Sequence, residues 1–355
     1  MRSTAVGCCL LASTCTTPGD GSSTGDAGGG ATDITELTGE PATTSAESTG
    51  EGEPACAVES PEGLMLCVDR ARYIADVVAV AEVRTPGSAH WSAVQDRCAT
   101  SLELAGFVVE VDDFGGGVNV VGTLPGSGAE ADEIILLGAH YDHIADCSGA
   151  DDNASGVAGA LEVARVLGAA ALRRTIVIAC WDQEEVGLQG SIAHAESLAE
   201  DAVVVAYNFD MIGFSDSAPD SQVFPGPLAE RFPGLSEELA ANEYRADFIA
   251  GAAEPFALDL EARAESLGRL TGVMTLTAEE KLSEDYSVLA RSDHRTFWQR
   301  GIPALHVFDT GLFRNSAYHC FGGADTVDTL DHDFAADVIR ATVGSMAKAA
   351  EVTTR

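Results

Sequence analysis

Apolar runs that end in acidic or imidazole side chains are the feature that most limits how this chain can fold. Residues 132–137 form a short β-branched run with the length of a buried strand, and Gly-Ala-His-Tyr-Asp-His follows at 138–143. Residues 154–167 then carry apolar side chains at helical spacing. Because such strands and helices alternate along the chain, the sequence predicts an α/β fold with a largely parallel sheet.

The same alternation continues on both sides of this segment. We expect further strands at residues 106–111, 118–124, 174–180, 202–210 and 302–308. We expect helices at residues 67–83, 88–104, 191–199, 258–269, 292–298 and 333–350. Apart from the helix at 258–269, the region 213–289 is expected to form loops that shape a substrate pocket.

Three successive predicted strands lead into side chains that can bind a metal. In an α/β sheet, the carboxyl ends of such strands converge on one crevice, where ligands commonly bind. A neutral imidazole and an ionised carboxylate are the nitrogen and oxygen ligands that Zn²⁺ accepts. The candidates in chain order are His140, Asp151, one of the adjacent acids Glu184 and Glu185, Asp210 and His319. Glu184 and Glu185 are adjacent and should point in different directions, so one can bind a metal while the other acts as a base.

A set of motifs in this order resembles the co-catalytic di-zinc aminopeptidase family, which also contains glutamate carboxypeptidase relatives and glutaminyl cyclases. The motifs are GAHYDH, GADDNASG, WDQEEVGLQGS, NFDMIG, SDH and the final Tyr-His. The resemblance covers residues 57–355. It implies a three-layer α/β sandwich with a mixed, mostly parallel central sheet, which is the phosphorylase/hydrolase-like architecture of zinc peptidases.

The resemblance also implies a role for each candidate residue. Asp151 would bridge two zinc ions, Glu185 and His319 would complete one site, and His140 and Asp210 would complete the other. Two metals about 3.5–4 Å apart lower the pKa of a shared water and polarise the scissile carbonyl.

Further side chains would act on the substrate or on the ligands. Glu184 would be the general base that takes a proton from the water and returns it to the leaving amine. Asp142 resembles the carboxylate that orients the imidazole of His140. Tyr318 resembles the phenol that stabilises the tetrahedral intermediate, and Asp293 and His294 are expected to line the site.

The implied function is that of a zinc-dependent exopeptidase, and in particular an aminopeptidase that releases amino-terminal residues from peptides. A glutaminyl cyclase and a catalytically inactive, peptidase-like ectodomain are the alternatives. One departure from the family pattern is the stretch Cys-Phe-Gly-Gly-Ala between His319 and Asp325, which is longer than the usual turn after this histidine.

The charge of the chain bears on its partners. The formal net charge is −36, from 56 acidic and 20 basic residues, whereas contacts to phosphates need clustered lysine and arginine. We therefore expect no nucleic acid as a partner, and the resemblance described above implies peptide substrates. No segment after the amino-terminal region contains 18 continuous apolar residues, so the body of the protein is not expected to span a membrane.

The amino-terminal region resembles an export signal followed by a tether. Residues 1–15 begin with a positive charge and a brief apolar core, and Cys15 loosely resembles the cysteine lipidated in bacterial lipoproteins. Lipidation, ordinary signal cleavage and a cytoplasmic apolar tip are left open. Residues 16–56 are expected to form a disordered acidic linker before the catalytic domain, 57–355. We expect an exported protein, either a cell-envelope lipoprotein or secreted.

Export would leave six cysteines in an oxidising compartment, where disulfides form. Cys147 lies between the predicted ligands His140 and Asp151, and Cys320 directly follows His319, so their loops should meet and a bond between them is expected. Cys67 with Cys98, or Cys56 with either, would form a separate bridge. Cys180 lies within a predicted buried strand and is expected to be an inert core thiol. Free thiols in a reducing cytoplasm are the alternative.

Overall fold

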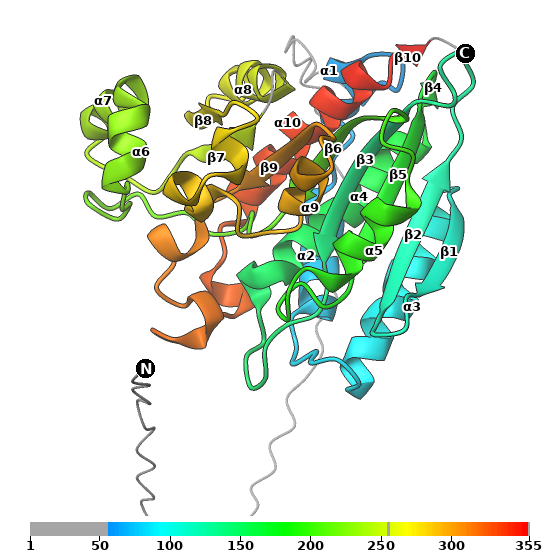
Figure 1. Ribbon diagram of the computed structural model, residues 1–355, viewed down its shortest axis with the longest axis horizontal. Helices are drawn as coiled ribbons and strands as arrows, with labels where there is room; N and C mark the ends of the chain where they lie inside the picture. Colours follow the sequence, from blue (N-terminus) through cyan, green and yellow to red (C-terminus); the bar gives the residue numbers. More distant parts are fainter. Residues whose placement is uncertain (1–55, 254–255, 354–355) are drawn as a thin grey trace, which may run out of the picture. The chain divides into compact units, whose positions relative to one another are not determined.

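A mixed sheet of eight strands forms the centre of the computed structural model (Figure 1), with the order β1-β2-β5-β3-β6-β9-β7-β8. The structure describes residues 56–253 and 256–353. The strands are β1 (Val108–Asp113), β2 (Val118–Leu124), β3 (Ile134–His140), β5 (Thr175–Trp181), β6 (Val203–Phe209), β7 (Ile249–Ala253), β8 (Thr271–Thr275) and β9 (Ala304–Phe308). β4 (Ala171–Leu172) and β10 (Val352–Thr353) form a separate antiparallel pair.

The middle of the sheet is parallel and its flanks are partly antiparallel. β5, β3, β6 and β9 run parallel to one another, whereas β1 and β2 run antiparallel on one flank. All seven residues of β5 are buried, whereas β1 at the edge has no buried residue. Continuous apolar strands between two covering layers are typical of parallel sheets.

Helices cover both faces of the sheet. Their bounds are α1 (Pro61–Met65), α2 (Arg70–Val80), α3 (Ala89–Leu104), α4 (Gly156–Gly168), α5 (Gln189–Ser197), α6 (Gly226–Arg231), α7 (Pro233–Ala241), α8 (Phe256–Ser266), α9 (His294–Gln299) and α10 (His332–Ala349). α4 packs against β3, β5 and β6, and α2, α3 and α10 pack against α4. On the opposite face, α5 contacts β2 and α9 contacts β6 and β9 (Figure 1). The expected three-layer α/β sandwich is confirmed.

The region between β6 and α9 is more ordered than the sequence predicts. It contains β7 and β8, which extend the sheet beyond β9, together with α6 and α7. The two strands read Ile-Ala-Gly-Ala-Ala and Thr-Gly-Val-Met-Thr. Alanine and glycine are depleted in strands, so pairing with β9, rather than local preference, explains why β7 forms here.

The six cysteines of the described residues form three disulfides: Cys56–Cys67, Cys98–Cys180 and Cys147–Cys320. The expected bond between Cys147 and Cys320 is confirmed. The prediction of an inert Cys180 thiol is wrong, because α3 packs on β5 and brings the Cα atoms of Cys98 and Cys180 within 6.6 Å. Both cysteines are fully buried, so burial does not distinguish a bonded cysteine from a free one.

The predicted export signal, the site at Cys15 and nearly all of the predicted linker lie outside the described residues. Among the helices that the structure does describe, none has both the length and the apolar character needed to cross a membrane.

The close packing of β3 against Trp181 can be tested at Gly138. A Cβ atom at this position would lie 2.2 Å from the Trp181 ring, and that ring is fully buried and packs against Phe297 at a centroid distance of 5.6 Å. We expect Gly138→Ala to lower the free energy of unfolding by about 1–3 kcal/mol. Denaturant titration measures this change.

Gly234→Ala in α7 is the matched control, because a Cβ atom there meets nothing within 4 Å. It should leave stability unchanged or raise it by about 0.5–1 kcal/mol, since alanine is the better helix former. Equal stability losses in the two variants would contradict the packing argument.

Candidate metal centre

The candidate metal centre lies at the carboxyl ends of the parallel strands. β3 ends at His140, the loop after β5 carries Glu184 and Glu185, and Asp210 directly follows β6. His319 lies in a short helical turn, residues 318–320, that follows β9. Because β5, β3, β6 and β9 are neighbours in the sheet, their loops meet over one edge.

One group of ligands forms around His140. Its Nε2 atom lies 3.3 Å from Asp152 Oδ1 and 3.5 Å from Asp210 Oδ1. All three side chains are buried, and within the part of the chain that the structure describes, Asp210 Oδ1 has no hydrogen-bond partner. A buried oxygen without a hydrogen bond is costly, and a metal ion in this group would satisfy it.

A second group shares the Asp152 carboxylate. His319 Nε2 lies 3.1 Å from Asp152 Oδ2 and 3.3 Å from Glu185 Oε2. The two oxygens of Asp152 therefore face different imidazoles, those of His140 and His319. This is the arrangement that a carboxylate needs in order to bridge two metal ions.

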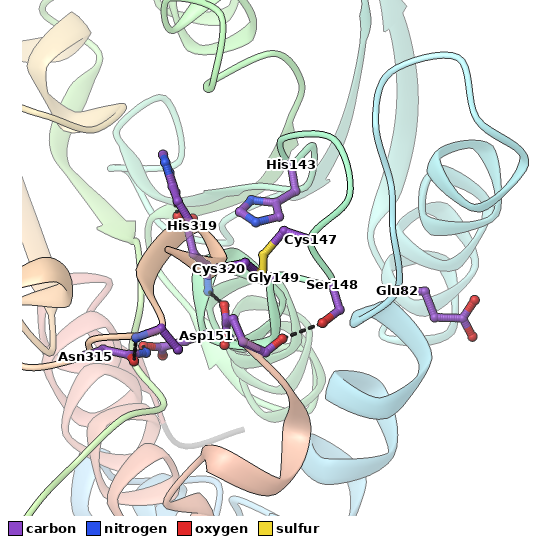
Figure 2. Close-up of a disulfide and its surroundings, with 12 residues drawn as sticks. Glu82, His143, Cys147, Ser148, Gly149, Asp151, Asn315, His319 and Cys320 are labelled. Atoms are coloured by element: carbon purple, nitrogen blue, oxygen red, sulfur yellow. Dashed lines mark hydrogen bonds and ion pairs between the residues drawn. A yellow bond between two sulfur atoms is a disulfide. The ribbon is translucent and has the colours of Figure 1, made fainter. Parts of the chain in front are cut away.

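The prediction that Asp151 bridges the two sites is wrong in position by one residue. Asp151 Oδ1 accepts a hydrogen bond from the Gly213 amide at 3.0 Å, and Oδ2 accepts one from Asn315 Nδ2 at 2.8 Å. Figure 2 shows Asp151 turned toward Asn315. Successive residues in this non-helical loop point in different directions, so Asp152, and not Asp151, faces both ligand groups.

Asp325 holds the loop that carries Asp152. Its carboxylate accepts hydrogen bonds from the backbone amides of Asp151 at 2.9 Å and Asp152 at 3.1 Å. Its backbone oxygen accepts a hydrogen bond from the Ser148 hydroxyl (Figure 2). Asp325 directly follows the stretch 320–324 that departs from the family pattern, and it supports the loop that carries Asp152 through these hydrogen bonds.

Arg84 also holds this loop. Its guanidinium is fully buried and donates hydrogen bonds to the backbone oxygens of Tyr141, Ser148, Gly149 and Asp152. Burial lowers the pKa of Arg84 to about 10, so the side chain stays charged at neutral pH. With a further hydrogen bond to the Glu82 backbone oxygen, the charged group is satisfied by backbone carbonyls and fixes the path of the chain from residue 141 to 152.

Asp142 connects the first histidine with the two glutamates. Its Oδ1 lies 3.6 Å from His140 Nδ1 and accepts a hydrogen bond from the Glu184 amide at 3.0 Å. Its Oδ2 accepts one from the Glu185 amide at 3.3 Å. The contact with His140 is longer than a hydrogen bond, so the orienting role of Asp142 stays a prediction.

Several site residues have backbone conformations that non-glycine residues rarely adopt. His319 and Cys320 have φ angles of 53° and 58°, Gln183 before Glu184 has 57°, and Met211 after Asp210 has 62°. Such conformations cost free energy and cluster at functional sites, where surrounding structure enforces them. At His319, the Cys147–Cys320 disulfide ties the next residue to the loop that follows His140 (Figure 2).

A small cavity opens beside the two ligand groups. Its polar lining includes Glu184, Tyr318, Asp152, Asp210 and His319, and its apolar lining is formed by Met211, Val288, Phe308, Leu312 and Phe313. Burial, together with the carboxylates of Asp210 and Asp293, raises the pKa of Glu184. The Tyr318 ring stacks on His319 at a centroid distance of 3.9 Å.

Asp293 and His294 do not line this cavity, contrary to the prediction. Ser292 and His306 line it instead. Both predicted residues are fully buried, and His294 Nε2 lies 2.7 Å from the Leu289 backbone oxygen while its ring stacks on His306. The short helix α9 turns these side chains inward, which the motif alone does not reveal.

The donor set fits zinc at both positions. Each group offers nitrogen from one histidine and oxygens from two carboxylates, which leaves an open position as catalytic zinc sites do. Two ligands of a tetrahedral zinc ion with bonds of about 2.0–2.1 Å lie about 3.3–3.4 Å apart. The separations of 3.1–3.5 Å measured here agree with that spacing.

Sequence reasoning missed Asp152, His143, Arg84 and Asp325. His143 lies 2.8 Å from Glu185 and belongs with Asp152 and Glu185 to a group that could hold a metal. Asp152 and His143 lie within the motifs used for the prediction, but the sequence does not show in which direction their side chains point. Arg84 and Asp325 lie far away in sequence, and no local pattern marks them.

Comparison with known proteins places this chain among metallopeptidase relatives. The model of Peptidase family M28 matches residues 119–346, more than half of the chain. The uncharacterized protein YfbL of Escherichia coli is 33% identical over 231 residues, which are 58% of this chain and 64% of YfbL. The probable lipoprotein aminopeptidase LpqL of Mycobacterium tuberculosis is 29% identical, over 56% of this chain and 38% of LpqL.

A solved structure has the same fold. The aminopeptidase from Aneurinibacillus sp. strain AM-1 superimposes with a TM-score of 0.62 at 16% sequence identity, over 83% of this chain and 97% of that protein. By contrast, the chain spans less than two thirds of the length of the curated relatives YfbL and LpqL.

Replacing each of the two neighbouring aspartates in turn tests which of them belongs to both ligand groups. We expect Asp152→Asn to lose most of its bound Zn²⁺, because both ligand groups contain this carboxylate. Asp151→Asn should keep its zinc, since that side chain faces Asn315 and Gly213. Equilibrium dialysis followed by elemental analysis measures zinc bound per chain.

Circular dichroism of both variants checks that they are folded. Loss of zinc from Asp151→Asn, with zinc retained by Asp152→Asn, would return the bridging role to Asp151.

Proposed function

The chain belongs to Peptidase family M28, and on that premise we propose that it is a zinc-dependent aminopeptidase that releases amino-terminal residues from peptides. One observation carries the proposal: two groups of metal ligands share the Asp152 carboxylate at the wall of a cavity that Glu184 also lines. Hydrolysis of a peptide bond needs a general base that activates water, and a positive centre that stabilises the negative charge of the transition state, next to the same carbonyl group.

Two zinc ions are part of the proposal. His140, Asp152 and Asp210 would hold one, and Asp152, Glu185 and His319 would hold the other. Zinc bound in such a pair would polarise the scissile carbonyl and lower the pKa of the attacking water. The separations between the ligand atoms support this assignment.

Glu184 is the general base in this proposal. Its carboxylate would accept a proton from the attacking water and later deliver it to the amine that leaves. The hydrogen bond from its own amide to Asp142, at 3.0 Å, supports a fixed position at the cavity wall. The adjacent Glu185 would bind the metal, so one glutamate would act as a base and the other as a ligand.

Tyr318 would stabilise the oxygen of the tetrahedral intermediate through its hydroxyl. Two observations support this role: the side chain lines the same cavity as Glu184, and its ring stacks on His319. A donor held near the developing negative charge lowers the barrier of acyl transfer.

The cavity also suggests which peptides are taken. Carboxylates and metal positions suit a free amino terminus, and the walls from Met211, Val288, Phe308, Leu312 and Phe313 suit an uncharged, apolar first side chain. The net charge of −36 should repel acidic peptides. We therefore propose a preference for apolar amino-terminal residues.

We also propose that the protein acts outside the cytoplasm. Its three disulfides support this, because such bonds form and persist in oxidising compartments. A lipid anchor through Cys15 is part of the same proposal, which the name of the relative LpqL suggests.

Replacing the base without touching the metal tests the mechanism. We expect Glu184→Gln to lower kcat on the order of 10²–10⁴-fold while zinc content stays unchanged, because Glu184 acts on the water. Turnover of leucyl-anilide and elemental analysis are measured on the same sample. Glu265→Gln, an exposed acid on α8, is the control and should behave as wild type. Near-normal turnover of Glu184→Gln would remove Glu184 from the mechanism.

Blocking the substrate amine tests the exopeptidase mode. We expect leucyl-anilide to be cut at least ten times faster than N-acetyl-leucyl-anilide. The charged free amine should be attracted by the carboxylates of the site, because opposite charges about 4 Å apart attract each other by about 1 kcal/mol or more. The acetylated amine carries no charge and loses this attraction. Equal rates would contradict the aminopeptidase proposal. Release of ammonia from a peptide with amino-terminal glutamine would favour a glutaminyl cyclase instead, and a zinc-loaded protein that cuts neither anilide would favour a non-catalytic ectodomain.

A further inference from the structure

The imidazole of His143 is buried against the proposed metal centre, and it is not one of the ligands assigned above, although it lies close enough to Asp152 and Glu185 to belong to a metal-binding group. Its side chain is 1% exposed, and its Nδ1 atom lies 2.8 Å from Glu185 Oε1. The other oxygen of this carboxylate, Oε2, lies 3.3 Å from His319 Nε2. Glu185 therefore divides its two oxygens between a histidine on one side and the second metal position on the other.

Distances separate a hydrogen-bonding role for His143 from a ligand role. Two ligands of one tetrahedral zinc ion should lie about 3.3–3.4 Å apart, as the pairs around Asp152 do. The 2.8 Å between His143 and Glu185 is shorter and matches a charge-assisted hydrogen bond. Nδ1 must then carry a proton, and the other ring nitrogen, Nε2, is buried with no hydrogen-bond partner among the described residues.

The surrounding loop is built to accommodate this ring. A Cβ atom at Gly149 would lie 2.5 Å from His143 Cδ2, and Gly149 has a φ angle of 54°. The backbone oxygen of Gly149 is in turn held by Arg84 at 2.8 Å. Figure 2 shows His143 next to the Cys147–Cys320 disulfide, which joins its loop to that of His319. The ring of His143 meets the ring of His319 edge to face at 5.8 Å.

We propose that His143 is a positioning residue: it donates its Nδ1 proton to Glu185 Oε1 and so presents only Oε2 to the second zinc ion. Because Oε1 accepts this hydrogen bond, Glu185 would bind the ion mainly through Oε2. The inference rests on the proposed function, because it requires zinc in the second group. Partners that orient metal ligands typically change metal affinity by about 10–100-fold.

Variants that keep or move the donor test this role. Asparagine places an amide NH₂ near the position of Nδ1, glutamine places it near Nε2, and alanine removes it. We expect His143→Ala and His143→Gln to weaken one of the two zinc dissociation constants by about 10–100-fold. His143→Asn should stay within about threefold of wild type. Competition with a chromophoric chelator at fixed pH measures both constants without any substrate.

Two controls assign the effect. In a His319→Ala background the second zinc is removed, so adding His143→Ala should leave the remaining constant unchanged. His90→Asn changes a histidine on α3 whose Nε2 contacts the Val80 backbone oxygen, and both constants should match wild type. If the alanine variant fails to fold by near-ultraviolet circular dichroism, the comparison of asparagine with glutamine still carries the test.

The outcomes separate this inference from the proposed function. If His143→Asn loses as much affinity as His143→Ala, the ring is itself a ligand and the positioning role is overturned. If His143→Ala binds two zinc ions as tightly as wild type, the inference fails while the aminopeptidase proposal stands. A wild-type protein that binds no zinc would overturn both.

Discussion

The concentration of buried carboxylates around Asp152 is the constraint on which the rest of the structure depends. Asp151, Asp309 and Asp325 are fully buried, and Asp152 and Asp210 are nearly so. Like charges out of water must be neutralised by protons, by imidazoles or by cations. For Asp152, burial alone would raise the pKa, but hydrogen bonds with His140 and His319 hold it well below its usual value. The neighbouring Asp151 differs, because burial and Asp309 raise its pKa.

The adjacent residues Asp151 and Asp152 therefore have different roles, because their surroundings differ. Asp151 is satisfied by Asn315 and the Gly213 amide, within the protein. Asp152 is left facing two imidazoles across space that a metal ion suits. Asp151 is bound to an amide side chain and a backbone amide and supports the loop, whereas the partners of Asp152 are two imidazoles that could bind the same metal ions.

The ligands come from separate segments of the chain, so contacts between their loops are needed to hold the metal centre together. The Arg84 guanidinium gathers four backbone oxygens of one loop, and Asp325 binds the amides of Asp151 and Asp152. The Cys147–Cys320 disulfide spans 173 residues of sequence and ends beside His319. Rigid support of this kind is what keeps a site within a few tenths of an ångström of its working geometry.

The sequence by itself determined the central strands, the order of the ligand-bearing loops and the bond between Cys147 and Cys320. These follow from local patterns: buried strands such as β5 read as continuous apolar runs, and acids or histidines after such strands must meet at one edge of the sheet. Tertiary structure alone decided that Asp152 faces the metal positions, that Cys180 pairs with Cys98, and that β7 and β8 extend the sheet. The physical reason is the same in each case. A sequence specifies which groups are present and in what order, whereas the direction of a side chain in a loop and the pairing of weak strand formers depend on partners that the fold brings from far along the chain.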